Sequence, residues 1–391
     1  QEPQDPHVAC HHNGAGAARF RWLLMNDQLS EARSTISALL REVRRRGMVE
    51  SEVHFLRALA ETELLAGHCG RALDLARESL RLARDSGIGE SASAMLASLA
   101  EASAGDLERA EALAREAAAH AEEDGDAMYL SRALAALGHA QLVAGDARGA
   151  VVSLRRVREL EAGLGITDPA RGRWHGDLAE ALVRIGEAGE AREILATARE
   201  HALRLGRESV LAVLDRGEAL VRAARGDTEG ALAQLTSVQD RLAKLGYGLE
   251  EARAAYALAR LRAGRPAGPG FGGAETTRVN ASYDEAARLF RRCRALPWLR
   301  QVEAAAEAAT AAAAERRASA PAGLHTALDS LASMERQVAG LVMEGATNRE
   351  IAARLFISVK TVEATLTRVY RKLGIRSRVD IVRLAAGRHA K

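Results

Sequence analysis

A short pattern recurs at intervals of 38 to 41 residues along the first 231 residues of the chain. In each copy, a Gly or Asp is followed five residues later by an Ala that opens an amphipathic segment. The six pairs are Asp27 and Ala32, Gly67 and Ala72, Gly105 and Ala110, Gly145 and Ala150, Gly186 and Ala191, and Gly226 and Ala231. A period of this length is typical of stacked helical hairpins and is unusual in a single globular domain. The sequence therefore predicts an α-solenoid of about six hairpins.

The residues of the pattern have local roles in such hairpins. The glycine is expected to end the first helix in a left-handed conformation. An Asp that follows it is placed to cap the second helix, as at Asp106, Asp146 and Asp227. The second helices are expected to end at Gly87, Gly125, Gly163, Gly206 and Gly246.

Composition supports an all-α fold. Hydrophobic residues make up 48% of the chain but aromatic residues only 3%, so the core must consist mainly of Ala, Leu and Val, which suits close-packed helices. The pattern resembles the tetratricopeptide repeat, although its period is longer. Such a solenoid could bind a partner or ligand on its concave surface, or it could serve only as a spacer or dimer scaffold.

Changes in composition predict the domain boundaries. The segment after Gly264 is rich in Gly and Pro and is expected to be a loop insertion, with a seventh, interrupted hairpin resuming at Tyr283. Pro321 lies in an Ala/Ser/Pro segment typical of a linker. The expected parts are a flexible N-terminal segment at 1–16, repeats at 17–317 with the loop insertion at about 265–281, a linker at 318–330, and a C-terminal domain at 331–391.

The C-terminal domain carries most of the charge imbalance. Residues 331–391 contain twelve basic and five acidic side chains, a net charge of +7, whereas the whole chain carries +3 and the first 330 residues therefore carry −4. A basic domain on a mildly acidic body favours a polyanionic partner. Charge alone leaves open a solvated basic surface without a partner.

Two short helices and a tight turn are expected within this domain. Thr347 and Glu350 form a capping-box pattern at the start of one helix, and Ser358 is placed to cap the next, which ends at Gly374. The buried stripe of that second helix is expected to comprise Val362, Leu366, Val369 and Leu373. Its opposite face presents small polar and basic side chains that suit the major groove of DNA, namely Lys360, Thr361, Ala364, Thr365, Thr367, Arg368 and Arg371. The Ser358 end can hold a backbone phosphate.

These residues resemble the LuxR-type helix-turn-helix of bacterial regulators over about fifty positions. The matching residues are Glu335, Gly345, Asn348, Glu350, Ile351, Ala352, Leu355, Ile357, Ser358, Thr361, Val362, Lys372, Leu373, Gly374 and Arg378. Ala332 departs from the Thr that commonly caps the first helix in that family, so Ser330 or Ser333 would have to cap it instead. The resemblance places the base-reading positions at Glu363, Ala364 and Thr367, and guanine reading is more expected from Arg368 or Lys360. The full set expected to bind DNA also includes Thr347, Asn348, Ser358, Thr361, Thr365, Arg371 and Lys372.

The resemblance also implies dimerisation through a fourth helix. Ile381, Val382, Leu384 and Ala385 are expected at the dimer contact, and paired half-sites about one helical turn apart would follow. The same residues could instead complete the core of the monomer.

The run from Val359 to Gly374 is similar to the large ATP-binding LuxR regulators of actinobacteria, the LAL or MalT-like group. In that group, an ATP-binding module precedes a helical repeat region and the DNA-binding domain. None of the four lysines follows a Gly, so this chain lacks the lysine of a P-loop, and any ATPase module would lie upstream of residue 1. The preference for Arg over Lys is consistent with a GC-rich genome.

The cysteines and histidines bear on the cellular compartment and on a candidate metal site. Cys10, Cys69 and Cys293 are scattered and odd in number, which indicates a reducing compartment. With neither a signal peptide nor a membrane span, the protein is expected to be cytoplasmic. His7, Cys10, His11 and His12 form the one dense group of metal-type ligands, where a disordered terminus is favoured over a zinc site. No cofactor, metal or enzymatic activity is expected in this chain.

The leading hypothesis is a sequence-specific transcriptional regulator, expected to be an activator, that binds promoter DNA as a homodimer and contacts RNA polymerase. The repeats would sense an effector or relay a signal. The alternative is a repeat-based scaffold that binds proteins or peptides and whose basic C-terminal domain serves protein contact.

Overall fold

The computed structural model describes residues 11–264, 272–319 and 331–385, with the side chains of 272–275, 316–319 and 382–385 left outside the description. These residues form helices and no strand, as the all-α prediction requires. The chain divides into two compact units. The first comprises 1–261 and 282–303, and is called the repeat body below; the second comprises 262–281 and 304–391.

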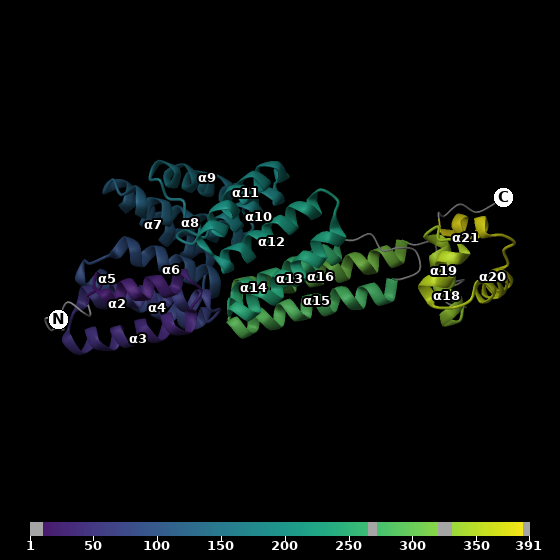
Figure 1. Cartoon of the computed structure of the whole chain (residues 1–391), viewed down its shortest axis with the longest axis horizontal. Helices are drawn as coiled ribbons and strands as arrows, with labels where there is room; N and C mark the ends of the chain where they lie inside the picture. The colour runs from purple at the N-terminus through teal and green to yellow at the C-terminus, as the bar shows by residue number, and fades with distance from the viewer. Residues whose placement is uncertain (1–10, 265–271, 320–330, 386–391) are drawn as a thin grey trace. The chain divides into compact units, whose positions relative to one another are not determined.

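The repeat body is built from successive helical hairpins (Figure 1). Each helix of a pair contacts its partner and the helix of the next hairpin, which is the packing of a solenoid. The pairs are α2 (Ala15–Met25) with α3 (Leu29–Arg46), α4 (Val49–Leu65) with α5 (Cys69–Ser86), α6 (Glu90–Ala104) with α7 (Leu107–Glu123), α8 (Ala127–Ala144) with α9 (Ala147–Gly163), α10 (His175–Arg184) with α11 (Ala188–Leu205), and α12 (Glu208–Ala224) with α13 (Thr228–Leu245). The predicted hairpins are confirmed.

The recurring alanines all lie in the core, each with 0% of its surface exposed. Five of the six turn residues adopt the expected positive φ, from 60° at Asp27 to 95° at Gly226. Gly105 does not, with φ at −117°. Glycine is required there for space instead, because a Cβ would lie 1.9 Å from a carboxylate oxygen of Glu101.

The expected aspartate caps are also found. Asp106, Asp146 and Asp227 each accept a hydrogen bond from a backbone N–H three residues later. The predicted end of this helix at Gly163 is confirmed, although Gly163 does not adopt the left-handed conformation. Gly163 is the last helical residue of α9, and the left-handed position is Gly165, with φ at 67°.

The array curves until its first hairpin contacts its sixth and seventh. Asp27, at the end of α2, accepts hydrogen bonds from the Ser209 backbone N–H (2.9 Å), the Ser209 hydroxyl (2.6 Å) and the Tyr247 hydroxyl (2.6 Å). Gly67, at the end of α4, approaches Gly248 so closely that a Cβ on Gly67 would lie 2.9 Å from the Gly248 Cα. These contacts join repeats that are distant in the sequence.

The seventh hairpin pairs α14 (Gly248–Ala263) with α15 (Gly272–Cys293), and α16 (Leu296–Ser319) follows. The expected loop insertion at 265–281 is too long, because helix α15 begins at Gly272. No Pro lies between Gly272 and Tyr283, so a helix can extend through this segment. Residues 265–271, most of the linker at 318–330, and residues 1–10 of the N-terminal segment lie outside the described residues.

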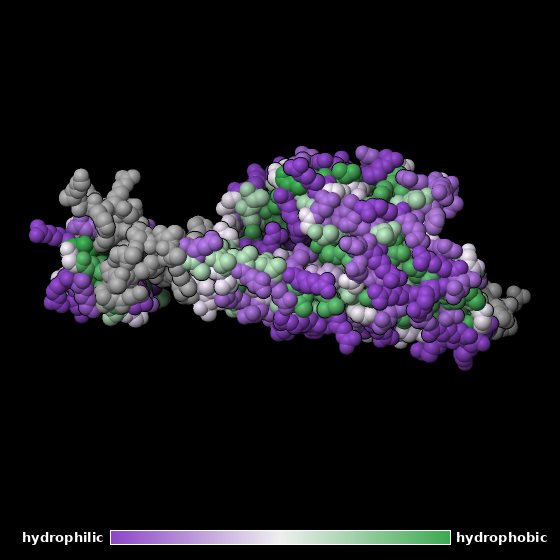
Figure 2. Space-filling model, turned by 180° about the vertical axis from the view of Figure 1, so that it is seen from behind, coloured by the Kyte–Doolittle hydropathy of each residue, from purple (hydrophilic) through white to green (hydrophobic). Residues whose placement is uncertain are grey.

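Two of the cysteines, Cys69 and Cys293, are free and buried. The ring nitrogens of His11 and His12 lie near the Glu50 carboxylate, a grouping that could hold a metal ion; His7 and Cys10 lie outside the described residues. Among the helices that the structure describes, none has the length and apolarity needed to cross a membrane. Figure 2 shows a largely hydrophilic face of the repeat body, with apolar side chains in separate small areas.

Candidate nucleic-acid interface

The described part of the C-terminal domain, residues 331–385, contains four short helices around one apolar core. They are α18 (Ser333–Met343), α19 (Asn348–Leu355), α20 (Val359–Leu373) and α21 (Arg378–Ala385). Val362, Leu366 and Val369 of α20 are buried in this core, and Leu373 packs against it half-buried. The predicted buried stripe of α20 is confirmed, and it turns the opposite face of the helix outward.

Side-chain caps define the helix starts. Thr347 and Glu350 form the predicted capping box: the Thr347 N–H donates to the Glu350 carboxylate at 2.7 Å, and the Glu350 N–H donates to the Thr347 hydroxyl at 3.3 Å. The Ser358 hydroxyl accepts from the Thr361 N–H at 3.1 Å. Ala332 cannot cap α18 with its side chain, and Ser333 does not replace it; Ser330 lies outside the described residues. Instead, the Glu335 carboxylate accepts the Ala332 N–H at 2.8 Å.

Most of the predicted DNA-binding side chains lie exposed along α20. The exposed set comprises Ser358, Lys360, Thr361, Glu363, Ala364, Thr367, Arg368, Arg371 and Lys372. The prediction for Thr365 is wrong, because its side chain is fully buried and its hydroxyl donates to the Thr361 carbonyl at 2.8 Å. Thr365 lies three residues after Val362, on the edge of the buried stripe, and its methyl group can join the core while its hydroxyl bonds within the helix.

Glu335 of α18 holds the C-terminal half of α20. Its carboxylate accepts a hydrogen bond from Lys372 Nζ at 2.6 Å, and Arg368 Nε lies 4.0 Å away. The hydrogen bond from Lys372, followed by that from the Ala332 N–H, lowers the pKa of Glu335. Lys372 is therefore engaged within the domain. Lys360 and Arg371 have no ion-pair partner among the described residues, which leaves their charges available to a ligand.

Arg378 fixes the start of α19. Its guanidinium donates to the Asn348 side-chain oxygen at 3.2 Å and to the Ala346 carbonyl. Asn348, predicted to bind DNA, thus links α19 to α21, while Thr347 beside it is exposed. Glu335 and Arg378 were both among the matching positions, but nothing in their spacing indicated that they orient the other helices.

The dimerisation set is only partly described. Ile381 is 1% exposed and belongs to the domain's own core, so the prediction that it lies at a dimer contact is wrong. Ile381 belongs to the core because α21 packs on α18. A domain this small has few apolar side chains with which to build a core. The side chains of Val382, Leu384 and Ala385 lie outside the description. Val379 lies on the same helix and is 56% exposed, although it is not among the predicted dimerisation residues.

The outward face of α20 has the dimensions and chemistry of a groove-binding helix. An α-helix with its side chains is about 10–12 Å across, and the major groove is about 12 Å wide. The backbone N–H groups of Val359 and Lys360 have no hydrogen-bond partner among the described residues, so the N-terminus of α20 can accept a phosphate oxygen. The free cations of Lys360 and Arg371, near the two ends of α20, can add attraction to the DNA backbone.

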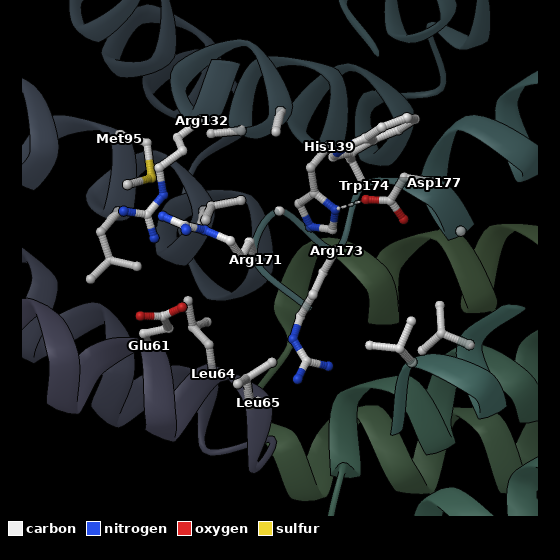
Figure 3. Close-up of a pocket in the computed structure, with 18 of the residues that line it drawn as sticks. Glu61, Leu64, Leu65, Met95, Arg132, His139, Arg171, Arg173, Trp174 and Asp177 are labelled. Carbon is white, nitrogen blue, oxygen red and sulfur yellow. Dashed lines mark hydrogen bonds and ion pairs between the residues drawn. The ribbon is translucent and has the colours of Figure 1, made fainter. Parts of the chain in front are cut away.

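The repeat body contains a second candidate site that sequence reasoning missed. It is a cavity of about 250 Å³ lined by residues of α2, of α9, of the segment between α9 and α10, and of α4, α6, α8, α10, α12 and α14 (Figure 3). Its lining residues lie up to 232 positions apart, from Arg21 to Arg253. No local pattern could have brought them together before the closure of the solenoid was known.

One end of this cavity is an internally compensated ion network. Arg253 donates to Asp177 at 2.6 Å and to Glu250 at 2.8 Å, and its guanidinium lies 4.9 Å from the Trp298 ring. Burial alone would raise the pKa of Asp177, but Arg253 and then His139 lower it below its ordinary value. The charges at this end of the cavity neutralise one another.

Comparisons with known proteins identify the C-terminal domain. Residues 329–385 match the family model for bacterial regulatory proteins of the luxR family. An HTH-type transcriptional regulator of Mycobacterium bovis is 54% identical over 59 residues, which are 15% of this chain and 7% of that protein. The oxygen regulatory protein NreC of Staphylococcus aureus is 44% identical over 55 residues, which are 14% of this chain and 25% of that protein. The matched segments are thus a small part of these relatives, and they lie in a LuxR-type helix-turn-helix domain.

The whole chain also has a structural neighbour. A Rap protein, solved in complex with competence and sporulation factor, superposes with a TM-score of 0.52 at 12% sequence identity, covering 95% of this chain and 98% of that chain. This likeness concerns the fold and agrees with a tetratricopeptide-like repeat body.

Proposed function

We propose that this protein is a transcriptional regulator that binds specific promoter DNA through α20. The observation that carries the proposal is the exposed polar and cationic face of that helix, opposite a stripe buried in the domain core. The luxR-family match over residues 329–385 and the HTH-type relatives support the same role.

The proposal is tested by DNA binding of the full chain at several salt concentrations. We expect the affinity to fall steeply with salt, since bound phosphates release counterions. Arg371→Ala should weaken binding and reduce the salt slope by about one. Arg84→Ala is the matched control, because Arg84 is an exposed arginine of the repeat body paired with Glu116. Equal binding by both variants, or no binding to any promoter fragment, would exclude the role given to α20.

The repeat body is proposed to sense an effector and to relay its presence to the DNA-binding domain. The cavity of the repeat body supports this, because a cavity with charged and apolar walls is a common form of ligand site. The alternative of a protein- or peptide-binding scaffold has some support from the Rap likeness, since that Rap protein was solved with a factor bound. A scaffold would retain partner binding but show no preference among DNA sequences.

The same proposal includes activation of transcription, dimerisation on DNA and the domain arrangement of a longer regulator. LuxR-type regulators commonly activate, so we place RNA polymerase and a second copy of the chain among the partners. The mycobacterial relatives are more than ten times longer than the segment they share with this chain, which is compatible with the LAL or MalT-like arrangement. Transcription reactions with purified polymerase would distinguish an activator from a repressor.

A further inference from the structure

The charges around the cavity are divided unevenly between its two ends. At the Asp177 end, Arg253 is neutralised by two carboxylates. At the opposite end, four arginines face only two carboxylates, an excess of two positive charges. The arginines are Arg21, Arg57, Arg132 and Arg171, and the carboxylates are Glu61 and Glu161. This group is called the arginine cluster below. The remaining lining arginine, Arg173, donates to the hydroxyls of Ser209 and Tyr247.

The two carboxylates do not neutralise the cluster by direct pairing. Glu161 accepts a hydrogen bond from Trp174 Nε1 at 2.8 Å and another from the Ser131 hydroxyl at 3.4 Å. Arg132 has no hydrogen bond or ion pair within the described part of the chain. Arg171 makes one long contact, 3.8 Å, to the sulfur of Met128. Figure 3 shows Arg132 and Arg171 directed toward one another across the cavity, with Glu61 on the facing helix.

Arg57 adds a buried donor without an acceptor. Its Nε is shielded from solvent and has no hydrogen-bond partner, while its Nη2 lies 3.2 Å from His54 Nδ1. Burial, followed by repulsion from Arg57 and Arg21, lowers the pKa of His54 to about 3. His54 therefore stays neutral, in keeping with a positive potential at this end. An unpaired buried donor of this kind favours a bound acceptor.

The wall between the two ends is apolar. Leu64 and Leu65 of α4 lie on one side and Met95 of α6 on another, with Val213 and Leu214 contributed by α12. A ligand that satisfies the arginine cluster would place the rest of its structure against this wall. The recognised chemistry is thus an anionic head joined to an apolar body.

Volume limits the size of that ligand. A dry apolar cavity of 150 Å³ is known to hold benzene, so about 250 Å³ corresponds to roughly ten non-hydrogen atoms. A second cavity of about 380 Å³ shares Arg21, Arg132 and Arg171 with the first. Arg21 and Arg171 are exposed, so the cluster lies where the interior meets solvent. It is a suitable place for a charged head.

We propose that the repeat body binds a small organic anion, with its carboxylate or phosphate on the arginine cluster and its apolar body against Leu64, Leu65 and Met95. This deepens the proposed function, on which it rests for the consequence that the ligand regulates DNA binding. The binding itself requires no DNA and can be tested separately.

The test is calorimetric titration of the full chain with four probes. Octanoate and hexyl phosphate carry the two anionic heads on apolar bodies of suitable size, octanamide has no charge, and acetate has no apolar body. We expect at least one of the two larger anions to bind ten-fold or more tightly than octanamide and acetate. The better of the two identifies the head group. Equal binding of octanamide, or binding of neither anion, overturns the proposal.

Variants assign the binding to the cluster. Arg132→Gln should weaken binding of the preferred anion ten-fold or more, and Arg132→Lys should retain most of it. Arg171→Gln, at an exposed position, supplies the same test should Arg132→Gln fail to fold, and Arg84→Gln is the control with an equal loss of charge. Unchanged affinity in the cluster variants overturns the proposal. Because these titrations contain no DNA, their outcome is independent of the salt-dependent DNA binding that tests the proposed function.

Discussion

Phe356, in the helix-turn-helix domain, combines a left-handed backbone conformation with an exposed side chain. It ends α19 with φ at 54° and ψ at 41°, in the left-handed region that side chains other than Gly rarely adopt. Its ring is 96% exposed. The turn between α19 and α20 therefore contains backbone strain without a compensating apolar contact.

We predict that Phe356→Gly stabilises the domain by about 0.5–1 kcal/mol, because glycine relieves the left-handed strain and no buried contact is lost. Phe356→Asn should give a smaller gain, since Asn tolerates this conformation. Hydrogen exchange of the α19 and α20 amides in the full chain reports the local stability. Faster exchange in the glycine variant would show that the exposed ring stabilises the turn after all.

His175 makes the stability of the repeat body sensitive to mild acid. It stacks on Trp174 with ring centroids 3.8 Å apart. Burial, followed by repulsion from His201, lowers the pKa of His175 from 6.5 to about 3. The unfolded chain therefore binds a proton below pH 6.5 that the folded chain does not, and stability falls as pH decreases from 6.5 toward 3.

We predict that the free energy of unfolding falls by up to about 1.4 kcal/mol per pH unit for each such histidine below pH 6.5. His54 behaves in the same direction, so His175→Phe should remove about half of the slope between pH 6 and 5. Urea unfolding of both proteins at pH 6 and pH 5 measures this change in the free energy of unfolding. Asp177 and Glu180, whose pKa values are lowered by neighbouring arginines despite their burial, retain their contribution through this range and lose it only at lower pH. An unchanged slope in the variant would contradict the assignment.

At the scale of the helix, the limits of periodicity are visible on α20. The capping residues Thr347 and Ser358 and the stripe beginning at Val362 followed from local spacing, because caps and helix faces depend on residues three or four positions apart. The helical spacing predicts an outward side chain for Thr365, but this residue borders the buried stripe and is itself buried. Lys372 is predicted to bind DNA, but it donates a hydrogen bond to Glu335, which lies 37 residues earlier. Spacing within one helix cannot reveal such a partner.

The two basic residues near the end of α20 should accordingly differ in role. We predict that Lys372→Gln lowers the stability of the C-terminal domain, because Glu335 loses its hydrogen-bonded cation, and leaves the salt slope of DNA binding nearly unchanged. Arg371→Gln should reduce that slope by about one and leave stability nearly unchanged. Parallel melting and salt-titration experiments on both variants measure the difference. An equal effect of the two substitutions on the slope would assign Lys372 to the DNA after all.

At the scale of the repeat body, the period predicted the hairpins but not the closure. An array with the same period can remain open or curve back on itself, because each repeat specifies only its contacts with its neighbours. Asp27 was recognised as a turn residue of the first hairpin, yet its side chain bonds to Ser209 and Tyr247, 182 and 220 residues away. The cavity and its arginine cluster follow from this closure, which is why neither had a signature in the sequence.

The closure contact can be tested at Asp27. Asp27→Ala removes the acceptor of three hydrogen bonds, including that of the buried Tyr247 hydroxyl. We predict a loss of about 2–3 kcal/mol in the free energy of unfolding and faster proteolysis between α2 and α3. Asp146→Ala is the control, since it removes a helix cap, at a cost of about 1 kcal/mol, but no contact between distant repeats. If both variants lose the same stability and show the same cleavage rate, Asp27 acts only within its own turn, and the cavity depends on the packing of Gly67 against Gly248 instead.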